Sequence, residues 1–401
     1  MASSSISAGG GGGGGAAAAS HEHRPVRFLK GHSQSLLCCI SPPANPHLVA
    51  TSGEDGMMCI FDLRSEARPQ KFEKFGEAVV SLCHHSGNEN HIIAAAGQTI
   101  YLMDVRLGPD GGELCKFQFN TDEINQVAIN QSGTFIAASD DSGEAKVIDL
   151  RGQKVFKTLR GGHVNICSSV QFHPKRSWEV LTGGLDCKII NWDFSRGKLI
   201  KGIDLSLDPG NSAHDFAGVC NPPFVHALAV SERDVSGETG QVLAVARGDG
   251  VVEVYNVEFD RSKSSVNKGP NRSINSSHRK QKEDERSHSD ALDCKGTHGT
   301  LGRICQLGSV NGGHTAAVSH VTFSRFGENG SLLVSGGNDA CLKLWNWSSC
   351  YCSSSKEQES SPLRLNILHR EKINWISTIA SSSDNLLVAG TSTYLTIYSI
   401  L

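Results

Sequence analysis

Short runs of apolar and β-branched residues, separated by turn residues, recur along most of the chain. Examples are Ala145–Ile148, Lys188–Ile190, Val251–Tyr255 and Thr396–Tyr398, with Gly, Asn or Asp at the bends. Runs of this length and composition are typical of β-strands. Apolar stripes with the 3.6-residue period of a helix are absent at any useful length. The pattern therefore predicts an all-β fold built from many short strands.

Two distant blocks of the sequence match position for position. The first block contains Gly162-His163, Val170-Gln171-Phe172, Leu181-Thr182-Gly183-Gly184 and Ile190-Asn191-Trp192-Asp193. The second contains Gly313-His314, Val321-Thr322-Phe323, Val334-Ser335-Gly336-Gly337 and Leu344-Trp345-Asn346. Two anchors at a fixed spacing resemble the Gly-His…Trp-Asp repeat of WD40 β-propellers, in which each repeat forms one four-stranded blade.

Weaker copies of the block fill the rest of the chain. They end at Phe61-Asp62, Met103-Asp104, Ile148-Asp149, Tyr255-Asn256 and Ile397-Tyr398. The steps from Asp62 to Asp104, Asp149 and Asp193 are 42, 45 and 44 residues, the period of this repeat. Seven copies predict a seven-bladed WD40 β-propeller.

The ends of the chain predict how the ring closes. Only three residues follow Tyr398, so the seventh blade lacks an outer strand of its own. The segment Val26–Lys30 precedes the first repeat and has no partner there, so we expect it to supply that strand. The predicted organisation is a disordered Gly/Ala/Ser-rich tail at 1–24 and a propeller at 25–401. A disordered polar insertion at about 260–300 separates blades 5 and 6.

The recurring polar residues have a structural interpretation. In this repeat a loop His, a strand Ser or Thr, a turn Asp and a Trp form a hydrogen-bonded chain within the blade, and buried polar groups require such pairing. Here the two chains are His163, Thr182, Asp186, Trp192 and His314, Ser335, Asp339, Trp345. A Ser/Thr–His–Asp set also suggests a catalytic triad, but a triad has no reason to recur once per blade. Blade 1 has Phe61 in place of Trp, and blade 3 has Ala138 and Ser142 in place of Thr and Asp.

Composition narrows the class of function. The net charge of -3 gives no basic field for nucleic acid. No apolar run reaches about 18 residues, and residues 1–20 lack the features of a signal peptide, so we expect no membrane association. Thirteen Cys without a CxxC pair favour buried thiols over a metal site and favour the cytoplasm or nucleus. Without HExxH, Gly-x-Ser-x-Gly or a P-loop, we expect no enzyme, cofactor or metal.

The stretch from Glu123 through Asn191, and Leu365-Asn366-Ile367 through Trp375, resemble the family of WD repeat-containing protein 53. The resemblance covers about 25–257 and 301–401. It implies a substrate receptor of a cullin-4 RING ubiquitin ligase, because such proteins carry a box ending in Asp, any residue, then Arg. The box ending occurs as Asp62 with Arg64, Asp104 with Arg106, and Asp149 with Arg151. Each Arg could bind an adaptor protein or merely satisfy carbonyls of its own turn; blade 4 lacks the Arg.

Loop positions suggest a second partner surface. Alignment with the His163 and Asp186 loops places Glu123, Asn125, Lys372, Asn374 and Trp375 on or beside the same face. Aromatic side chains near charges are favoured interface anchors, although Trp375 could instead be buried against a neighbouring blade. The sequence thus predicts a non-enzymatic, monomeric scaffold that binds proteins. A general scaffold or a reader of peptides or histone tails, without a ligase link, is the alternative.

Overall fold

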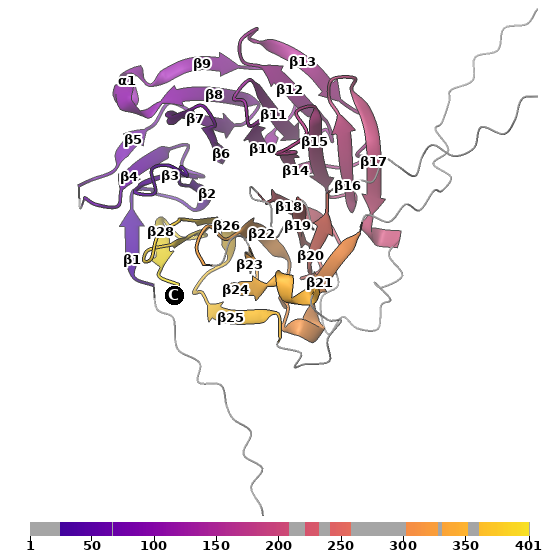
Figure 1. Ribbon diagram of the computed structural model, residues 1–401. Coiled ribbons are helices and arrows are strands. Elements are labelled where there is room, and N and C mark those ends of the chain that lie inside the picture. Colours follow the sequence, from indigo (N-terminus) through magenta and orange to yellow (C-terminus); the bar gives the residue numbers. More distant parts are fainter. Residues whose placement is uncertain are drawn as a thin grey trace, which may run out of the picture.

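Seven four-stranded antiparallel sheets form a ring in the computed structural model of the protein (Figure 1). The structure describes residues 25–65, 67–207, 221–231, 241–257, 302–327, 331–351 and 361–400. The predicted tail at 1–24 and the predicted insertion at 260–300 lie outside these residues. The all-β, seven-bladed architecture expected from the repeat is confirmed.

Each blade contains strands A to D, counted from the innermost strand outward. In blades 1 to 3 they are β2 (Leu36–Ile40), β3 (Leu48–Gly53), β4 (Met58–Asp62), β5 (Gln70–Phe72); β6 (Val79–His85), β7 (Asn88–Ala96), β8 (Thr99–Asp104), β9 (Glu113–Phe117); β10 (Ile124–Ile129), β11 (Phe135–Asp140), β12 (Ala145–Asp149) and β13 (Lys154–Leu159).

The remaining blades repeat the arrangement. In blades 4 to 7 the strands are β14 (Cys167–Phe172), β15 (Glu179–Gly184), β16 (Lys188–Asp193), β17 (Lys198–Asp204); β18 (Val225–Val230), β19 (Val242–Arg247), β20 (Val252–Asn256), β21 (Arg303–Leu307); β22 (Val318–Phe323), β23 (Leu332–Gly337), β24 (Cys341–Asn346), β25 (Leu363–Leu368); β26 (Ile373–Thr378), β27 (Leu386–Gly390), β28 (Tyr394–Tyr398) and β1 (Arg27–Lys30).

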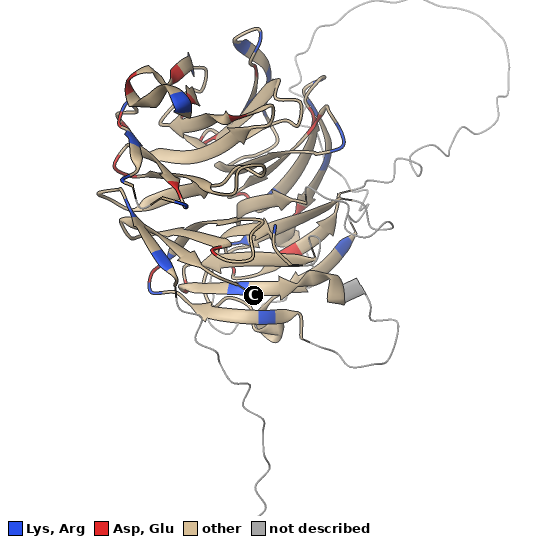
Figure 2. Cartoon of the chain, turned by 60° about the vertical axis from the view of Figure 1, so that its left-hand side comes forward, with Lys and Arg blue, Asp and Glu red and all other residues tan. Residues whose placement is uncertain are grey.

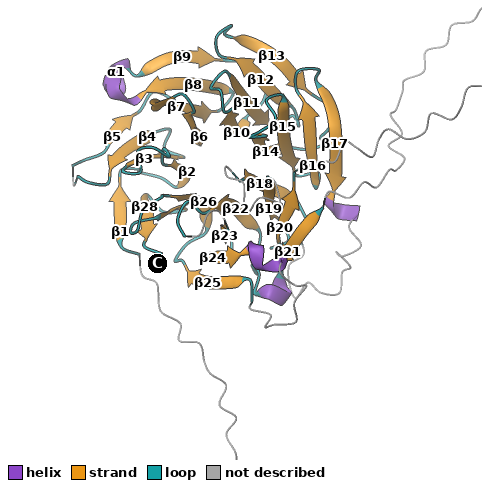
Figure 3. Cartoon of the chain, viewed as in Figure 1, coloured by secondary structure: helices purple, strands orange, loops and turns teal. Residues whose placement is uncertain are grey.

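Short helical turns lie at the outer rim of the ring (Figure 3). They are η1 (Val105–Leu107), α1 (Gly108–Gly111), η2 (Leu205–Leu207), η5 (Ser309–Asn311) and η6 (Trp347–Tyr351). Among the described residues, no helix is long and apolar enough to cross a membrane.

The core lies between neighbouring blades. All six residues of β15 are buried, whereas the outer strand β17 of the same blade has no fully buried residue. One apolar cluster, for example, joins residues of blade 3 such as Val147 to residues of blade 4 such as Val170 and Trp192. Because each blade buries its faces against two neighbours, an open ring would expose apolar surface as well as unpaired strand edges.

The ring closes through the N-terminal strand. β1 pairs antiparallel with β28 in the register Arg27↔Ile397 to Lys30↔Tyr394. The backbone amide of Val26 adds a bond to the carbonyl of Ile397 at 2.8 Å. The prediction that Val26–Lys30 completes blade 7 is confirmed, with the regular strand beginning one residue later.

Candidate functional site

The strand directions define two faces of the ring. Strand A of every blade begins at the connection from strand D of the preceding blade, which in blade 4 carries His163, and ends at the A–B turn. Strands B, C and D then alternate in direction. The D–A connections and B–C turns, which carry His163 and Asp186, form what we call the histidine face. The A–B and C–D turns form the opposite side, called the arginine face because it carries Arg64, Arg106 and Arg151.

Blades 4 and 6 each contain a continuous polar chain. In blade 4, Trp192 Nε1 donates to Thr182 Oγ1 at 2.9 Å, and His163 lies 2.8 Å from both Thr182 and Asp186. In blade 6, Trp345 Nε1 donates to Ser335 Oγ at 2.8 Å. A neutral His that accepts from the hydroxyl and donates to the Asp satisfies every member.

Blade 6 shows how burial acts on this chain. His314 lies 2.7 Å from Ser335 Oγ and 3.0 Å from Asp339. Burial lowers the pKa of His314 below its usual value, and the hydrogen bond to Asp339 offsets this only in part. The same geometry recurs in both blades, which fits a structural role for the Ser/Thr–His–Asp sets. Blade 1 retains His32 within 2.8 Å of Thr51, without an indole donor.

Blade 5 contains a buried ion cluster that the sequence analysis missed. Arg247 occupies the register position of Gly184 and donates from Nε to Asp249 at 3.0 Å. Its Nη1 lies 2.7 Å from Glu253, and the side chains of both residues are fully buried. Tyr255 donates to the second Glu253 oxygen at 2.6 Å. The available signal was a Glu in the middle of an apolar strand, since such a residue requires a buried cation.

The Asp-x-Arg endings form three similar turns on the arginine face. Arg64 donates through Nε and Nη2 to the two oxygens of Asp62, at 3.0 and 2.7 Å. Arg106 makes the same forked contact with Asp104 at the same two distances. These hydrogen bonds lower the pKa of each Asp to about 2. The carboxylates therefore stay ionised and hold both guanidinium groups in place.

Pairing does not bury these arginines. The side chains of Arg64 and Arg106 remain 63% and 60% exposed. Arg151 is also exposed, and its backbone amide donates to Asp149 at 3.0 Å, as the amides of the other two do to their Asp residues. Because the three turns belong to consecutive blades, their guanidinium groups form one arc along the ring.

The residues predicted as a second partner surface separate into two groups. Glu123 and Lys372 are exposed. Asn125 and Asn374 instead donate side-chain hydrogen bonds to the first strand of the next blade, at the carbonyls of Cys167 (3.3 Å) and Leu36 (2.8 Å). These amides therefore connect neighbouring blades at the inner wall of the ring.

Trp375 is half-buried on the innermost strand of blade 7. It stacks on His320 of blade 6 with ring centroids 4.0 Å apart. Burial lowers the pKa of His320 to about 3, so this imidazole is neutral at physiological pH. Trp375 thus packs between blades while keeping part of its surface open.

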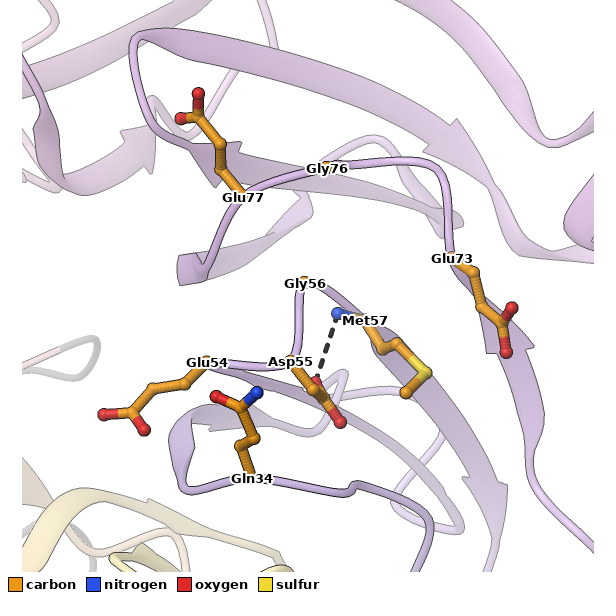
Figure 4. A pocket seen from close by; sticks show the side chains of 8 residues that line it. All are labelled: Gln34, Glu54, Asp55, Gly56, Met57, Glu73, Gly76 and Glu77. Atoms are coloured by element: carbon orange, nitrogen blue, oxygen red, sulfur yellow. Dashed lines mark hydrogen bonds between the residues drawn. The ribbon is translucent and has the colours of Figure 1, made fainter.

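The histidine face also has an acidic pocket between blades 1 and 2, shown in Figure 4. Its volume is about 360 Å³, and its lining includes the exposed Glu54, Glu73 and Glu77. Asp55 lies at its base and accepts from the amide of Met57 at 3.2 Å (Figure 4). Such a lining favours a cationic group. Charged residues elsewhere lie mainly in turns and outer strands (Figure 2).

Within the described ranges, no group of three or more His, Cys, Asp or Glu is placed to hold a metal ion. Several cysteines in the described part of the chain, among them Cys38 and Cys59, are fully buried and form no disulfide bond. Burial raises the pKa of Cys38 and Cys59 to about 12, which keeps their thiols protonated.

Comparisons with known proteins agree with the repeat. The family model "WD domain, G-beta repeat" matches residues 23–62, 153–193 and 305–346. The chain is 24% identical to a WD repeat-containing protein 53 homolog of Dictyostelium discoideum, over 93% of each chain. It is 26% identical to THO complex subunit 3 and 25% identical to "Cell division cycle 20.4, cofactor of APC complex", both of Arabidopsis thaliana. These matches cover 42% and 68% of this chain and about half of each relative (51% and 48%).

Proposed function

We propose that this chain, a seven-bladed propeller of WD40 repeats, is a non-enzymatic substrate receptor of a cullin-4 RING ubiquitin ligase. Its role as a scaffold for protein interaction follows from the fold and the repeat. The finer proposal is that the ligase adaptor docks on the arginine face through Arg64, Arg106 and Arg151. The histidine face then stays available for the recruited protein, in the cytoplasm or the nucleus.

The observation that carries this proposal is the repetition of one exposed Asp-x-Arg turn in blades 1, 2 and 3. A guanidinium group has five N–H donors, and the contact with the neighbouring Asp uses only two of them in Arg64 and Arg106. The contact orders a side chain that stays about 60% exposed, so its remaining donors are open to a partner. A partner carboxylate or carbonyl cluster could therefore bind with little loss of side-chain entropy.

The comparisons support a place within a larger assembly. One similar protein is by name a cofactor of the APC complex, and another is a subunit of the THO complex. The relative matched over nearly the whole chain is a WD repeat-containing protein 53 homolog. A receptor that connects an adaptor to a recruited protein is consistent with these relatives.

Binding of purified cullin-4 adaptor to the full-length protein tests the proposal. Replacing Arg64, Arg106 and Arg151 together with Ala should weaken binding at least about tenfold, as expected for interface Arg anchors. Lys at the three positions should restore binding only in part, because an ammonium group lacks the planar fork. Unchanged affinity of a correctly folded Ala variant would contradict the proposal.

Two arginines provide matched controls. Arg196 lies on the arginine face in blade 4, 76% exposed, with a looser 3.7 Å contact to Asp193. Arg160 is similarly exposed on the histidine face. Arg196→Ala and Arg160→Ala should leave adaptor binding unchanged. A loss in either variant equal to that of the triple variant would show that general surface charge, rather than the Asp-x-Arg turns, drives binding.

The acidic pocket favours a second candidate function, a reader of basic peptides such as histone tails. Glu54, Glu73 and Glu77 surround an opening that suits a Lys or Arg side chain. Replacing all three with Gln should then abolish binding of a Lys/Arg-rich peptide and leave adaptor binding intact. Adaptor binding without peptide binding supports the receptor, and the reverse supports the reader.

A further inference from the structure

Five aromatic rings cluster where blades 3 and 4 meet on the arginine face. Phe172 and Phe194 form a buried layer, with ring centroids 5.6 Å apart. Phe135, Phe156 and Trp178 lie against Phe194 at 5.5, 6.1 and 5.3 Å and are only partly covered. We call these three side chains the aromatic shelf. Trp178 is 47% exposed, although a Trp side chain is usually mostly buried.

The turn that presents Trp178 is held rigidly. His173 Nδ1 accepts the backbone amides of Lys175 and Arg176, both at 3.2 Å. The backbone amide of Glu179 donates to the carbonyl of Arg176 at 3.0 Å, which closes the turn. Trp178 also stacks on Phe156, with the ring planes 29° apart. The indole is thus ordered before any partner arrives, which reduces the entropic cost of binding.

The charges beside the shelf are asymmetric. Exposed basic side chains follow the C–D turns of blades 3 and 4, namely Arg151, Lys154, Arg196 and Lys198. Lys157 lies between the two turns, since a Cβ built on Gly197 would approach its Cδ to 2.9 Å. Figure 1 shows β13 and β17, the outer strands of these two neighbouring blades, at the rim of the ring.

The nearby acidic side chains are engaged within the protein. Glu179 is buried and accepts from Asn191 at 2.8 Å and from Arg176 at 3.2 Å. Asp193 accepts the backbone amide of Ser195 at 3.0 Å, and Asp149 accepts that of Arg151. The basic side chains therefore dominate the charge that this part of the surface presents to a partner.

We propose that the aromatic shelf binds an acidic protein segment that carries an aromatic or large aliphatic side chain. The apolar side chain would lie on Trp178 and Phe156, while neighbouring carboxylates would contact Lys154, Arg196 and Lys198. An exposed, ordered Trp surrounded by complementary charge has the features of an interface anchor. Nucleic acid fits less well, because a bound strand follows a positively charged groove over several nucleotides. The basic side chains beside the shelf form only a short patch, and the net charge of the chain is -3.

This site does not depend on the ligase adaptor. It lies over blades 3 and 4 and overlaps the Asp-x-Arg turns only in blade 3, at Arg151. Variants of Trp178, Arg196 and Lys198 leave Arg64, Arg106 and Arg151 in place. Failure of the shelf to bind an acidic segment would therefore leave the proposed adaptor contact standing, and the reverse also holds.

The test uses fluorescence anisotropy with the full-length protein and three labelled probes. The first probe is a peptide with Phe between two short Asp/Glu runs, the second has Ala in place of Phe, and the third is a thymine oligonucleotide of equal charge. The Phe peptide should bind at least about tenfold more tightly than the Ala peptide, the range for one buried aromatic anchor. Added salt should weaken binding of both peptides.

Variants assign the binding to the shelf. Trp178→Ala should remove the difference between the two peptides, and this exposed position permits the change without unfolding. Arg196→Glu with Lys198→Glu should weaken both peptides and leaves the aromatic rings untouched. Val164→Ala, at an apolar position 83% exposed on the opposite face, is the matched control and should change nothing.

Three results would overturn the proposal. One is the absence of measurable binding of the Phe peptide to the unmodified protein. Another is equal affinity for the Phe and Ala peptides, or an unchanged difference between them in Trp178→Ala. The third is tighter binding of the oligonucleotide than of the Phe peptide, which would identify the surface as a nucleic-acid site.

Discussion

Blade 5 has the same four-stranded architecture as blades 4 and 6, but its buried centre has a different chemistry. An ion pair stabilises blade 5, whereas a hydrogen-bonded chain of polar side chains stabilises blades 4 and 6. In blades 4 and 6, Trp, Ser or Thr and a neutral His form a chain that ends on one ionised Asp, whose pKa is lowered by hydrogen bonds from the His and from backbone amides. In blade 5 the equivalent space holds the ionised pair Arg247 and Glu253, joined by Asp249 and Tyr255. Blade 2 fills the same positions with Phe75, Ala94 and Met103, all apolar.

The fold therefore requires that the centre of each blade is fully packed and that its buried polar groups have partners. It does not require one particular set of residues there. A hydrogen-bonded chain in which only the terminal Asp is charged carries a smaller desolvation cost. A buried ion pair carries a large one, which only close and complete pairing offsets. Blade 5 should therefore be the most sensitive of these blades to the loss of one partner.

The largest effect is expected from Arg247→Met. The change keeps an apolar side chain but leaves the buried Asp249 without its cation, and it leaves Glu253 with only the partly exposed Arg303 at 3.2 Å. Breaking a buried pair in this way should lower the free energy of unfolding by about 3–5 kcal/mol, measured by urea titration. Arg64→Met, at an exposed ion pair, should change it by less than about 1 kcal/mol. A loss below about 1 kcal/mol for Arg247→Met would refute the sensitivity assigned to blade 5.

A smaller loss is expected from Trp345→Phe in blade 6. The change removes the indole donor, yet Ser335 keeps its 2.7 Å contact with His314. We expect a cost of about 1–3 kcal/mol from the lost hydrogen bond and the reduced packing. Trp178→Phe, at the partly exposed shelf, is the control and should cost clearly less. If Trp345→Phe costs more than Arg247→Met, the ranking of the two chemistries is reversed.

The histidine-based chain of blade 6 should make stability depend on pH. Burial lowers the folded-state pKa of His314 below 6.5, so the unfolded chain binds more protons as the solution is acidified. Its contribution is complete above pH 6.5 and is lost as the pH falls, by at most about 1.4 kcal/mol per pH unit. Urea titrations at pH 7.5 and 5.5 should show a smaller pH effect in His314→Asn than in the unmodified protein. An equal pH effect in both would exclude His314 as a contributor.

The smallest effect is expected from Phe61→Trp in blade 1. This blade keeps His32, Thr51 and Asp55, with His32 2.9 Å from Asp55, and lacks only the indole. A Cβ built on Gly31 would lie 3.0 Å from the Phe61 ring, and one built on Gly162 would lie equally close to the Trp192 ring or closer. In both blades the glycine therefore leaves space for the ring. The new donor to Thr51 should raise the free energy of unfolding by up to about 1 kcal/mol. A clear loss of stability would mean that blade 1 cannot accommodate the larger ring.

The sequence predicts those features that depend on repetition. The Gly-His…Trp-Asp anchors predict seven blades, and the strand-like segment Val26–Lys30 before the first repeat predicts the closing strand β1. The Arg247 cluster was not predictable in the same way, because Arg303 reaches Glu253 from a strand 50 residues away (3.2 Å). A pattern read along the sequence does not show a contact between two strands of one blade that lie so far apart in the chain.

The surfaces illustrate the same limit. Glu54 lies in the B–C turn of blade 1 and Glu77 in the connection to blade 2, and the folded chain brings them to one pocket. Asn125 and Asn374 lie in irregular parts of their strands, where the register shifts against the neighbouring strand. Side-chain direction at such a bulge depends on local backbone geometry. Alignment therefore located these residues without showing that their amides contact the next blade.

Hydrogen exchange of the full-length protein, alone and bound to purified cullin-4 adaptor, tests whether the adaptor docks on the arginine face. Exchange should be slower in the complex at the arginine-face turns of blades 1 to 3, within 62–65, 104–108 and 149–153. Exchange around the histidine-face pocket, at 54–57 and 73–77, should stay unchanged. Protection confined to the histidine face, or no protection at all under saturating adaptor, would contradict the account.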